Sequence, residues 1–270
     1  MFEEKMYIDT HSHIYVEEFD ADREQVIRRA LDAGVVRMLL PAIDGQSYER
    51  MFALSRAHAE CCTPMMGLHP TSVNDNPHWR EELSQVERYL RNPPAGAFCA
   101  VGEIGLDFYW SSEFKQEQIE AFRQQIEWAL EYDLPIAVHV RGAWAETVAL
   151  MEHYTGRGLR GVFHAFTEGV ESYRALRVCG DFVFGIGGVV TFKKSTLPDV
   201  VRQMSLEEIV LETDCPYLTP APHRGERNES ANVQYICAKI ADIKGISTDE
   251  VAAITTANAC RIFRIEEQIK

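Results

Sequence analysis

Strand-like and helix-like segments alternate along almost the whole chain, and this alternation constrains the fold more than any other feature. Short runs of β-branched and other apolar residues are each followed by a segment of helical character. Parallel strands need crossover helices between them, so eight such units predict a parallel sheet covered by helices. We expect strands at residues 6–9, 35–41, 63–68, 98–104, 136–140, 161–164, 182–186 and 209–213.

The helical segments show their own signals. Apolar residues recur at steps of three or four within 79–90, 122–129, 144–151 and 233–243. Gly156 and Gly245 are expected to end the last two of these helices, because glycine readily adopts the left-handed conformation of a helix end. Ser247 followed by Glu250 has the spacing of a capping box and predicts the start of a final helix.

Two folds share these local units, the closed (β/α)₈ barrel and the doubly wound open sheet. The chain has 270 residues, and a barrel commonly uses about 250 in one domain. In a barrel the functional residues lie at the C-terminal ends of several strands, and here polar residues follow five different strand-like runs. We therefore predict an α/β, single-domain TIM barrel over residues 1–270, with its site at those strand ends.

The side chains at these strand ends are ones that bind metal ions. His11 and His13 stand two residues apart, so on an extended chain both imidazoles point the same way. Glu103 lies within an apolar run, where a carboxylate is seldom tolerated without a partner. The fifth, sixth and eighth runs add His139, His164 and Asp214. Surface or core histidines explain each position singly, but not all of them together.

Imidazole and carboxylate ligands suit a divalent metal ion. Zn, Mn, Fe, Ni and Mg all accept such ligands, and a shared glutamate can bridge two ions. We expect one or two ions per chain, with the metal left open. Two ions roughly 3.5–4 Å apart would suit hydrolysis of a phosphoester or an amide.

Several motifs together resemble the TatD family of metal-dependent deoxyribonucleases, which belongs to the amidohydrolase-type superfamily. They are His11-Ser12-His13, Gly-Leu-His-Pro at 67–70, Gly-Glu-Ile-Gly-Leu-Asp at 102–107, Glu-Thr-Asp-Cys-Pro-Tyr-Leu at 212–218 and Arg-Gly-Glu-Arg-Asn-Glu at 224–229. They occur in the family's order over nearly the whole chain. Ala165 replaces the usual Cys, and Ser230 stands where Pro is common, but neither change removes a ligand.

The resemblance implies a barrel that hydrolyses DNA phosphodiester bonds with a metal-activated water, and it suggests 3′–5′ exonuclease action. It further implies that Glu103 and Asp214 are catalytic, with Asp214 taking the proton from the attacking water. His11, His13 and Asp214 would hold one ion, His139 and His164 the other, and Glu103 would bridge them. His69 and Arg224 match positions near the substrate in such proteins.

The charge balance limits how nucleic acid can be bound. With 27 Lys and Arg against 41 Asp and Glu, the net charge is −14, which is unsuited to coating DNA through a positive field. We therefore expect DNA to enter as ends or single strands at the barrel mouth, with no obligate protein partner. No apolar run is long enough to span a membrane, and the acidic start is unlike a signal peptide. These features and seven cysteines without a pairing pattern favour a cytoplasmic protein.

Two alternatives remain at this stage. Another amidohydrolase-type enzyme, such as a lactonase, phosphotriesterase or amidase, would use a similar set of ligands. Many of these bridge their metals through a modified lysine on the fourth strand, and Glu103 at this place favours the nuclease. A non-catalytic binding barrel is the second alternative, and it would be indicated by the loss of a ligand, which is not seen.

Overall fold

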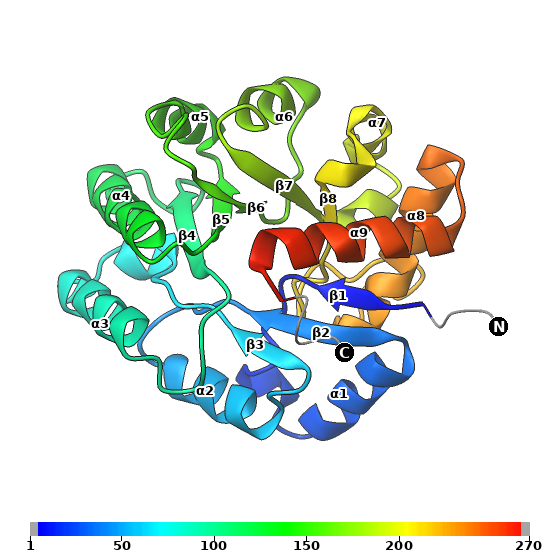
Figure 1. Cartoon of the computed structure of the whole chain (residues 1–270), viewed down its shortest axis with the longest axis horizontal. Helices are drawn as coiled ribbons and strands as arrows, with labels where there is room; N and C mark the ends of the chain where they lie inside the picture. The colour runs from blue at the N-terminus through cyan, green and yellow to red at the C-terminus, as the bar shows by residue number, and fades with distance from the viewer. Residues whose placement is uncertain (1–4, 266–270) are drawn as a thin grey trace.

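Strands alternate with helices throughout the computed structural model, which describes residues 5–265 (Figure 1). The strands of this range are β1 (Tyr7–Asp9), β2 (Val35–Leu40), β3 (Cys62–Pro64), β4 (Val101–Asp107), β5 (Ile136–Arg141), β6 (Arg160–Phe163), β7 (Asp181–Ile186) and β8 (Ile209–Leu211). The α-helices are α1 (Arg23–Asp32), α2 (Tyr48–Ala57), α3 (Trp79–Arg91), α4 (Lys115–Glu131), α5 (Trp144–Glu152), α6 (Val170–Leu176), α7 (Leu197–Gln203), α8 (Val233–Lys244) and α9 (Thr248–Phe263).

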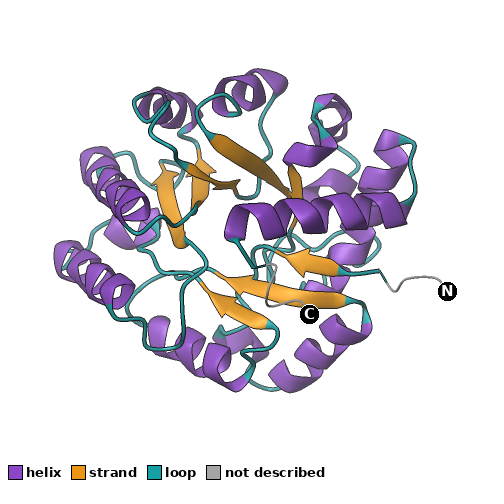
Figure 2. Ribbon diagram, in the orientation of Figure 1, coloured by secondary structure: helices purple, strands orange, loops and turns teal. Residues whose placement is uncertain are grey.

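The strands follow one another in chain order around a ring, with helices on its outside (Figure 2). All pairs are parallel, in two groups, β1-β2-β3 and β4 to β8. Single parallel bridges join the groups at both seams, Met66 with Val101 and Ser12 with Cys215. An open sheet would leave its two edge strands apart, so the ring agrees with the predicted TIM barrel.

Alternation along the strands divides the core into two parts. A large cluster packs between the ring and the helices, and it includes Ile136 and Val138 of β5. The smaller cluster fills the inside of the ring with small aliphatic side chains, including Ala137, Val162 and Val210. Both faces of each strand are therefore buried, which explains why the strand segments read as continuous apolar runs.

Helix α9 closes one end of this interior. Its residues Ile262 and Phe263 belong to the same apolar cluster as the inward side chains of the strands. Thr256 Oγ1 donates to the carbonyl oxygen of Met6, 2.9 Å away, just before β1 begins. Figure 1 shows α9 crossing beside β1 and β8. The helix thus covers the N-terminal ends of the strands and leaves their C-terminal ends accessible.

Most predicted elements occur where the sequence placed them. The cap of α9 is confirmed, because Ser247 Oγ accepts from the Glu250 amide at 3.1 Å. Gly245, at φ +69°, ends α8 as predicted. Helix α5, in contrast, ends at Glu152, before the predicted stop at Gly156.

The limits of β3 and β4 differ most from prediction, whereas each of the other strands differs by at most two residues at either end. Strand β3 covers only Cys62–Pro64 instead of 63–68, because the chain beyond it keeps one bridge to β4, at Met66. Strand β4 begins at Val101 and continues to Asp107, because its end stays paired with β5 as far as Arg141. The predicted domain range 1–270 extends beyond the described residues at both ends. Within 5–265, no helix combines the length and apolar character required to cross a membrane.

Candidate metal centre

Strand geometry points three polar side chains into the mouth of the barrel. Residues two apart on a strand face the same side. His139 comes two residues after the inward Ala137, His164 two after Val162, and Glu212 two after Val210. The alternation that fills the interior with small apolar side chains therefore places imidazole and carboxylate groups at its C-terminal end.

Glu103 lies at the centre of the cluster, and its two carboxylate oxygens face different groups. Oε2 lies 3.1 Å from His11 Nε2 and 3.6 Å from His13 Nε2. Oε1 lies 2.9 Å from His139 Nδ1, 3.4 Å from His69 Nε2 and 3.9 Å from His164 Nε2. One carboxylate from β4 thus contacts two sets of imidazoles.

Asp214 completes the cluster from the segment after β8. Its Oδ1 lies 3.5 Å from His13 Nε2, 3.8 Å from His164 Nε2 and 4.0 Å from His11 Nε2. The Asp214 side chain is 14% exposed, whereas that of Glu103 is 4% exposed. Asp214 is therefore the carboxylate of the cluster that solvent reaches more easily.

The imidazoles are held by their outer nitrogens. Tyr15 OH donates to the carbonyl oxygen of Pro41 at 2.6 Å, so it accepts from His13 Nδ1 at 3.1 Å. His139 Nε2 lies 3.0 Å from Asp107 Oδ2, and His164 Nδ1 lies 3.0 Å from Glu212 Oε1. An N–H of His13 and of His139 directed at these oxygens leaves the other nitrogen of each ring with its lone pair facing the cluster. The contact of His164 with Glu212 is an ion pair without hydrogen-bond geometry.

This arrangement fits a divalent metal ion. Ligand atoms placed about 2.1 Å from an ion in tetrahedral geometry lie about 3.4 Å from one another. The Nε2 atoms of His11 and His13 are 3.1 Å apart, and the contacts of Asp214 and Glu103 fall between 2.9 and 4.0 Å. Within this cluster, three sets of side chains can each surround an ion: His11, His13 and Glu103; His11, His164 and Asp214; His69, Glu103 and His139.

The imidazoles of the cluster are shifted in opposite directions, while its central carboxylate is held ionised. Burial opposes protonation of His164, but Glu212 and Asp214 outweigh it and raise its pKa to about 10. Burial and the neighbouring His164 lower the pKa of His11 to about 4. Burial would raise the pKa of Glu103, but the surrounding histidines overcome it and hold the pKa well below its usual value. A cation among these groups would supply the charge that the carboxylates attract.

The structure brings all six predicted metal ligands into this one cluster. His69, predicted near the substrate, also lies in it and can share an ion with Glu103 and His139. Arg224 has its described contacts elsewhere: Nη1 donates to the Thr219 carbonyl oxygen at 2.7 Å, and the guanidinium stacks 3.7 Å above the Phe192 ring.

Two carboxylates of the site, Asp107 and Glu212, contact histidines in a way that the sequence did not predict. Asp107 was visible in the 102–107 motif, as the last residue of an apolar run. Its partner became clear only from the pairing of β4 with β5, which sets His139 beside it. Glu212 accepts the Ala165 amide at 2.6 Å as well as contacting His164.

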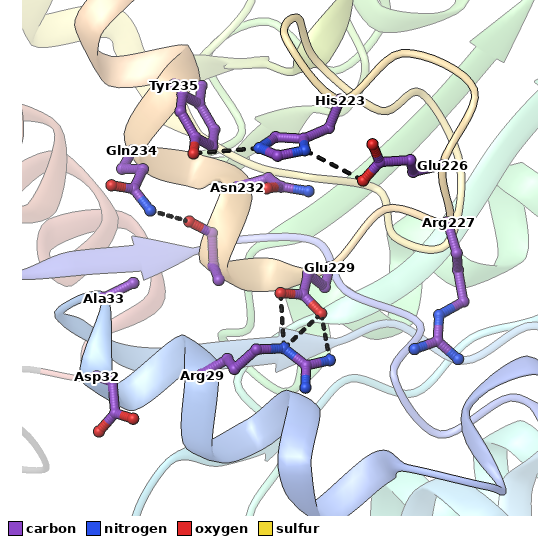
Figure 3. A pocket seen from close by; sticks show the side chains of 11 residues that line it. Arg29, Asp32, Ala33, His223, Glu226, Arg227, Glu229, Asn232, Gln234 and Tyr235 are labelled. Carbon is purple, nitrogen blue, oxygen red and sulfur yellow. Dashed lines mark hydrogen bonds and ion pairs between the residues drawn. The ribbon is translucent and has the colours of Figure 1, made fainter.

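A separate cavity of about 520 Å³ lies outside the ring, between α1 and the segment leading into α8 (Figure 3). Two contacts join charged groups of its lining. Arg29 Nη2 lies 2.6 Å from Glu229 Oε2, and His223 contacts Glu226 at 3.1 Å and Tyr235 OH at 3.2 Å. None of the predicted metal ligands lines it, so this cavity is distinct from the metal cluster.

Comparison with known proteins places the cluster in a family. The sequence model of TatD related DNases matches residues 8–264. The chain is 36% identical over 265 residues to the "uncharacterized metal-dependent hydrolase YabD" of Bacillus subtilis (strain 168), covering 96% of this chain and 100% of that protein. It is 30% identical over 254 residues to the "3′-5′ ssDNA/RNA exonuclease TatD" of Pectobacterium parmentieri (strain WPP163), covering 92% and 95% of the two chains.

A solved structure supports the same assignment. The crystal structure of YJJV, a TatD homolog from Escherichia coli K12, aligns with a TM-score of 0.87 and 27% identity, covering 96% of this chain and 98% of that one. Sequence and fold therefore agree over nearly the whole chain. The protein belongs to the TatD family of metal-dependent hydrolases.

Proposed function

We propose that this protein is a metal-dependent deoxyribonuclease that hydrolyses phosphodiester bonds at the 3′ ends of single strands. The observation that carries the proposal is the position of Glu103, whose two oxygens face two sets of imidazoles. Such a carboxylate can bridge two ions, and paired ions are typical of enzymes that cleave phosphodiesters. Relatives named as 3′-5′ ssDNA/RNA exonucleases support the choice of substrate and direction.

The two sides of Glu103 define which residues would hold the ions. His11, His13 and Asp214 would bind on one side and His139 and His164 on the other, with His69 available to the second side. His164 also lies 3.8 Å from Asp214 and could share the ion of the first side. When bound, divalent ions would lower the pKa of a water molecule and neutralise charge on the phosphate oxygens. Tyr15, Asp107 and Glu212 would keep the imidazoles in the orientation that this binding requires.

Asp214 is the residue we assign as proton acceptor. Burial would raise its pKa, but His164 and His13 outweigh burial and hold the pKa below its usual value. The carboxylate is therefore ionised at neutral pH and able to accept a proton from an attacking water. Its 14% exposure places it where water and substrate can arrive, in contrast to the more deeply buried Glu103.

The test is a substrate panel assayed with and without metal. Single-stranded oligonucleotides labelled at the 5′ end should be shortened stepwise, and a blocked 3′ terminus should protect them. Chelation should abolish the reaction, and an added divalent ion should restore it. Asp214→Asn protein purified in parallel controls for a contaminating nuclease.

The same panel separates the alternatives. Turnover of a lactone, a phosphotriester or an amide, without cleavage of any oligonucleotide, would assign the cluster to a different hydrolase. Cleavage that persists after exhaustive chelation would contradict the metal-dependent chemistry.

A further inference from the structure

Three large aromatic side chains are exposed at the end of the barrel that holds the metal cluster. Tyr109, Trp110 and Tyr217 are 62%, 68% and 53% exposed, and no other aromatic side chain among residues 5–265 is a large exposed hydrophobic group. Tyr109 follows Asp107 by two residues, and Tyr217 follows Asp214 by three. Tyr and Trp bury well in cores and interfaces, so this distribution indicates a binding function at the mouth.

Tyr109, Trp110 and Arg141 together form a platform. The Tyr109 and Trp110 rings pack edge to face, with centroids 5.0 Å apart and planes at 86°. The Arg141 guanidinium lies 3.7 Å from the Tyr109 ring centroid and 5.2 Å from that of Trp110. No carboxylate in the described part of the chain forms an ion pair with Arg141, so this platform combines aromatic faces with an uncompensated positive charge.

Short hydrogen bonds connect the platform to the metal cluster. The Tyr109 amide donates to Asp107 Oδ1 at 3.0 Å, while Asp107 Oδ2 contacts His139 Nε2 at 3.0 Å. The Phe108 amide donates to the Arg141 carbonyl oxygen at 2.9 Å, which joins the two segments of the platform. Tyr109 is only two residues from Asp107, a separation of at most about 7 Å. The platform therefore lies next to the side chains of the metal cluster.

We propose that this platform stacks an unpaired nucleobase of the substrate strand, one or two nucleotides from the bond being cleaved. Aromatic rings and arginine planes are the groups on which single-stranded nucleic acids stack, because every base has a π-face. The contact would be independent of base identity, and Arg141 would attract the adjacent phosphate. This inference rests on the proposed nuclease function and adds to it the residues that select single strands.

The platform also explains how an acidic protein binds a polyanion. A chain with net charge −14 repels DNA at long range, and stacking supplies attraction that does not depend on net charge. Binding through a few bases would further exclude a paired duplex, whose bases are already stacked on one another.

The experiment combines side-chain changes with changes in the substrate. Trp110→Leu and Tyr109→Leu remove an aromatic face while keeping apolar bulk, and Trp110→Phe keeps a ring. Each leucine variant should raise KM for a single-stranded oligonucleotide roughly tenfold, whereas Trp110→Phe should stay within about threefold of wild type. Val178→Ser changes an exposed apolar side chain that follows α6, at the opposite end of the barrel, and should leave KM unchanged.

Oligonucleotides with one abasic position, moved stepwise from the 3′ end, give the reciprocal test. At one position the missing base should raise the wild-type KM by the same factor as Trp110→Leu, and the two changes together should add nothing further. Metal content should be the same in all variants.

The outcomes separate the two proposals. A KM for oligonucleotides that is insensitive to both leucine variants and to every abasic position would overturn the platform and leave the nuclease standing. Failure of the wild-type protein to cleave any oligonucleotide would overturn both. An effect of Trp110→Leu on the mass of the protein in solution, with KM unchanged, would assign these rings to a protein interface and also overturn the platform.

Discussion

Gly185→Ala should impair metal binding at the cluster although it changes none of the predicted ligands. Gly185 occupies the position on β7 that is equivalent to His139 on β5 and His164 on β6, two residues after an inward side chain. A Cβ atom there would lie 1.9 Å from Glu212 Oε2 and 2.5 Å from its carboxyl carbon. The glycine therefore leaves the space that the Glu212 carboxylate fills.

The size of the effect follows from these distances. An ordinary contact begins near 3.4 Å, so the carboxylate must move by about 1.5 Å. That movement breaks the 3.0 Å contact with His164 and the 2.6 Å hydrogen bond from Ala165. Overpacking of this kind costs about 1–3 kcal/mol, which lowers the melting temperature of a chain this long by about 2–6 °C. Loss of a partner that orients a ligand reduces metal affinity or activity about 10–100-fold.

Gly187→Ala is the matched control for Gly185→Ala. Its Cβ would lie 3.6 Å or more from Glu212, in ordinary contact, and its φ of −106° suits alanine. Metal affinity by competitive titration, turnover of the oligonucleotide and thermal unfolding should be measured for both variants. Equal metal affinity and turnover in the two would show that the Glu212 contact does not position His164, and our reasoning about the site would fail.

Three further predictions address the proton acceptor, the bound phosphate and a buried thiol. Asp214→Asn should fold normally and lose about 10²–10⁴-fold in turnover; near wild-type turnover by the metal-loaded variant would move the proton acceptor to Glu212 or His69. Arg224→Ala should raise KM and reduce the salt dependence of binding by about one unit of slope, with metal content unchanged, and an unaltered slope in a salt series would exclude a phosphate contact. Burial raises the pKa of the Cys99 thiol to about 12, so the folded state favours the protonated thiol. The contribution of this thiol to the free energy of unfolding is complete below the usual thiol pKa of about 8.5 and is lost as pH rises through the pKa of the folded state. Melting temperatures of wild type and Cys99→Ala should therefore converge at high pH, and parallel curves would count against the burial argument.

That the predicted ligands meet in one cluster could be expected from sequence, because their positions depend on local rules. Alternation on a strand directs His139 and His164 inward, and the spacing of His11 and His13 brings both imidazoles to one place. The support for these ligands depends on which strands are neighbours and in which register. Asp107 meets His139 only because β4 runs three residues past its predicted end while paired with β5.

The position of His69 in the cluster could likewise not be predicted from sequence. The motif around it was visible, yet its distance from Glu103 depends on how the chain leaves β3. Gly67 passes so close to β4 that a Cβ there would lie 2.8 Å from the Gly102 carbonyl carbon. This close approach brings His69 Nε2 to 3.4 Å from Glu103 Oε1, and no spacing in the sequence states that two backbones touch.

Helix α9, which closes the N-terminal end of the barrel, has a consequence for how the protein folds during its synthesis. The strands emerge from the ribosome first, and the side chains that seal their interior, Ile262 and Phe263, emerge only after all of them. Until then Ala137, Val162 and Val210 border an apolar tube that is open to water at one end. The growing chain must therefore complete eight strand–helix units in a state that exposes surface to chaperones and to other nascent chains. The interior can be sealed only after α9 has emerged.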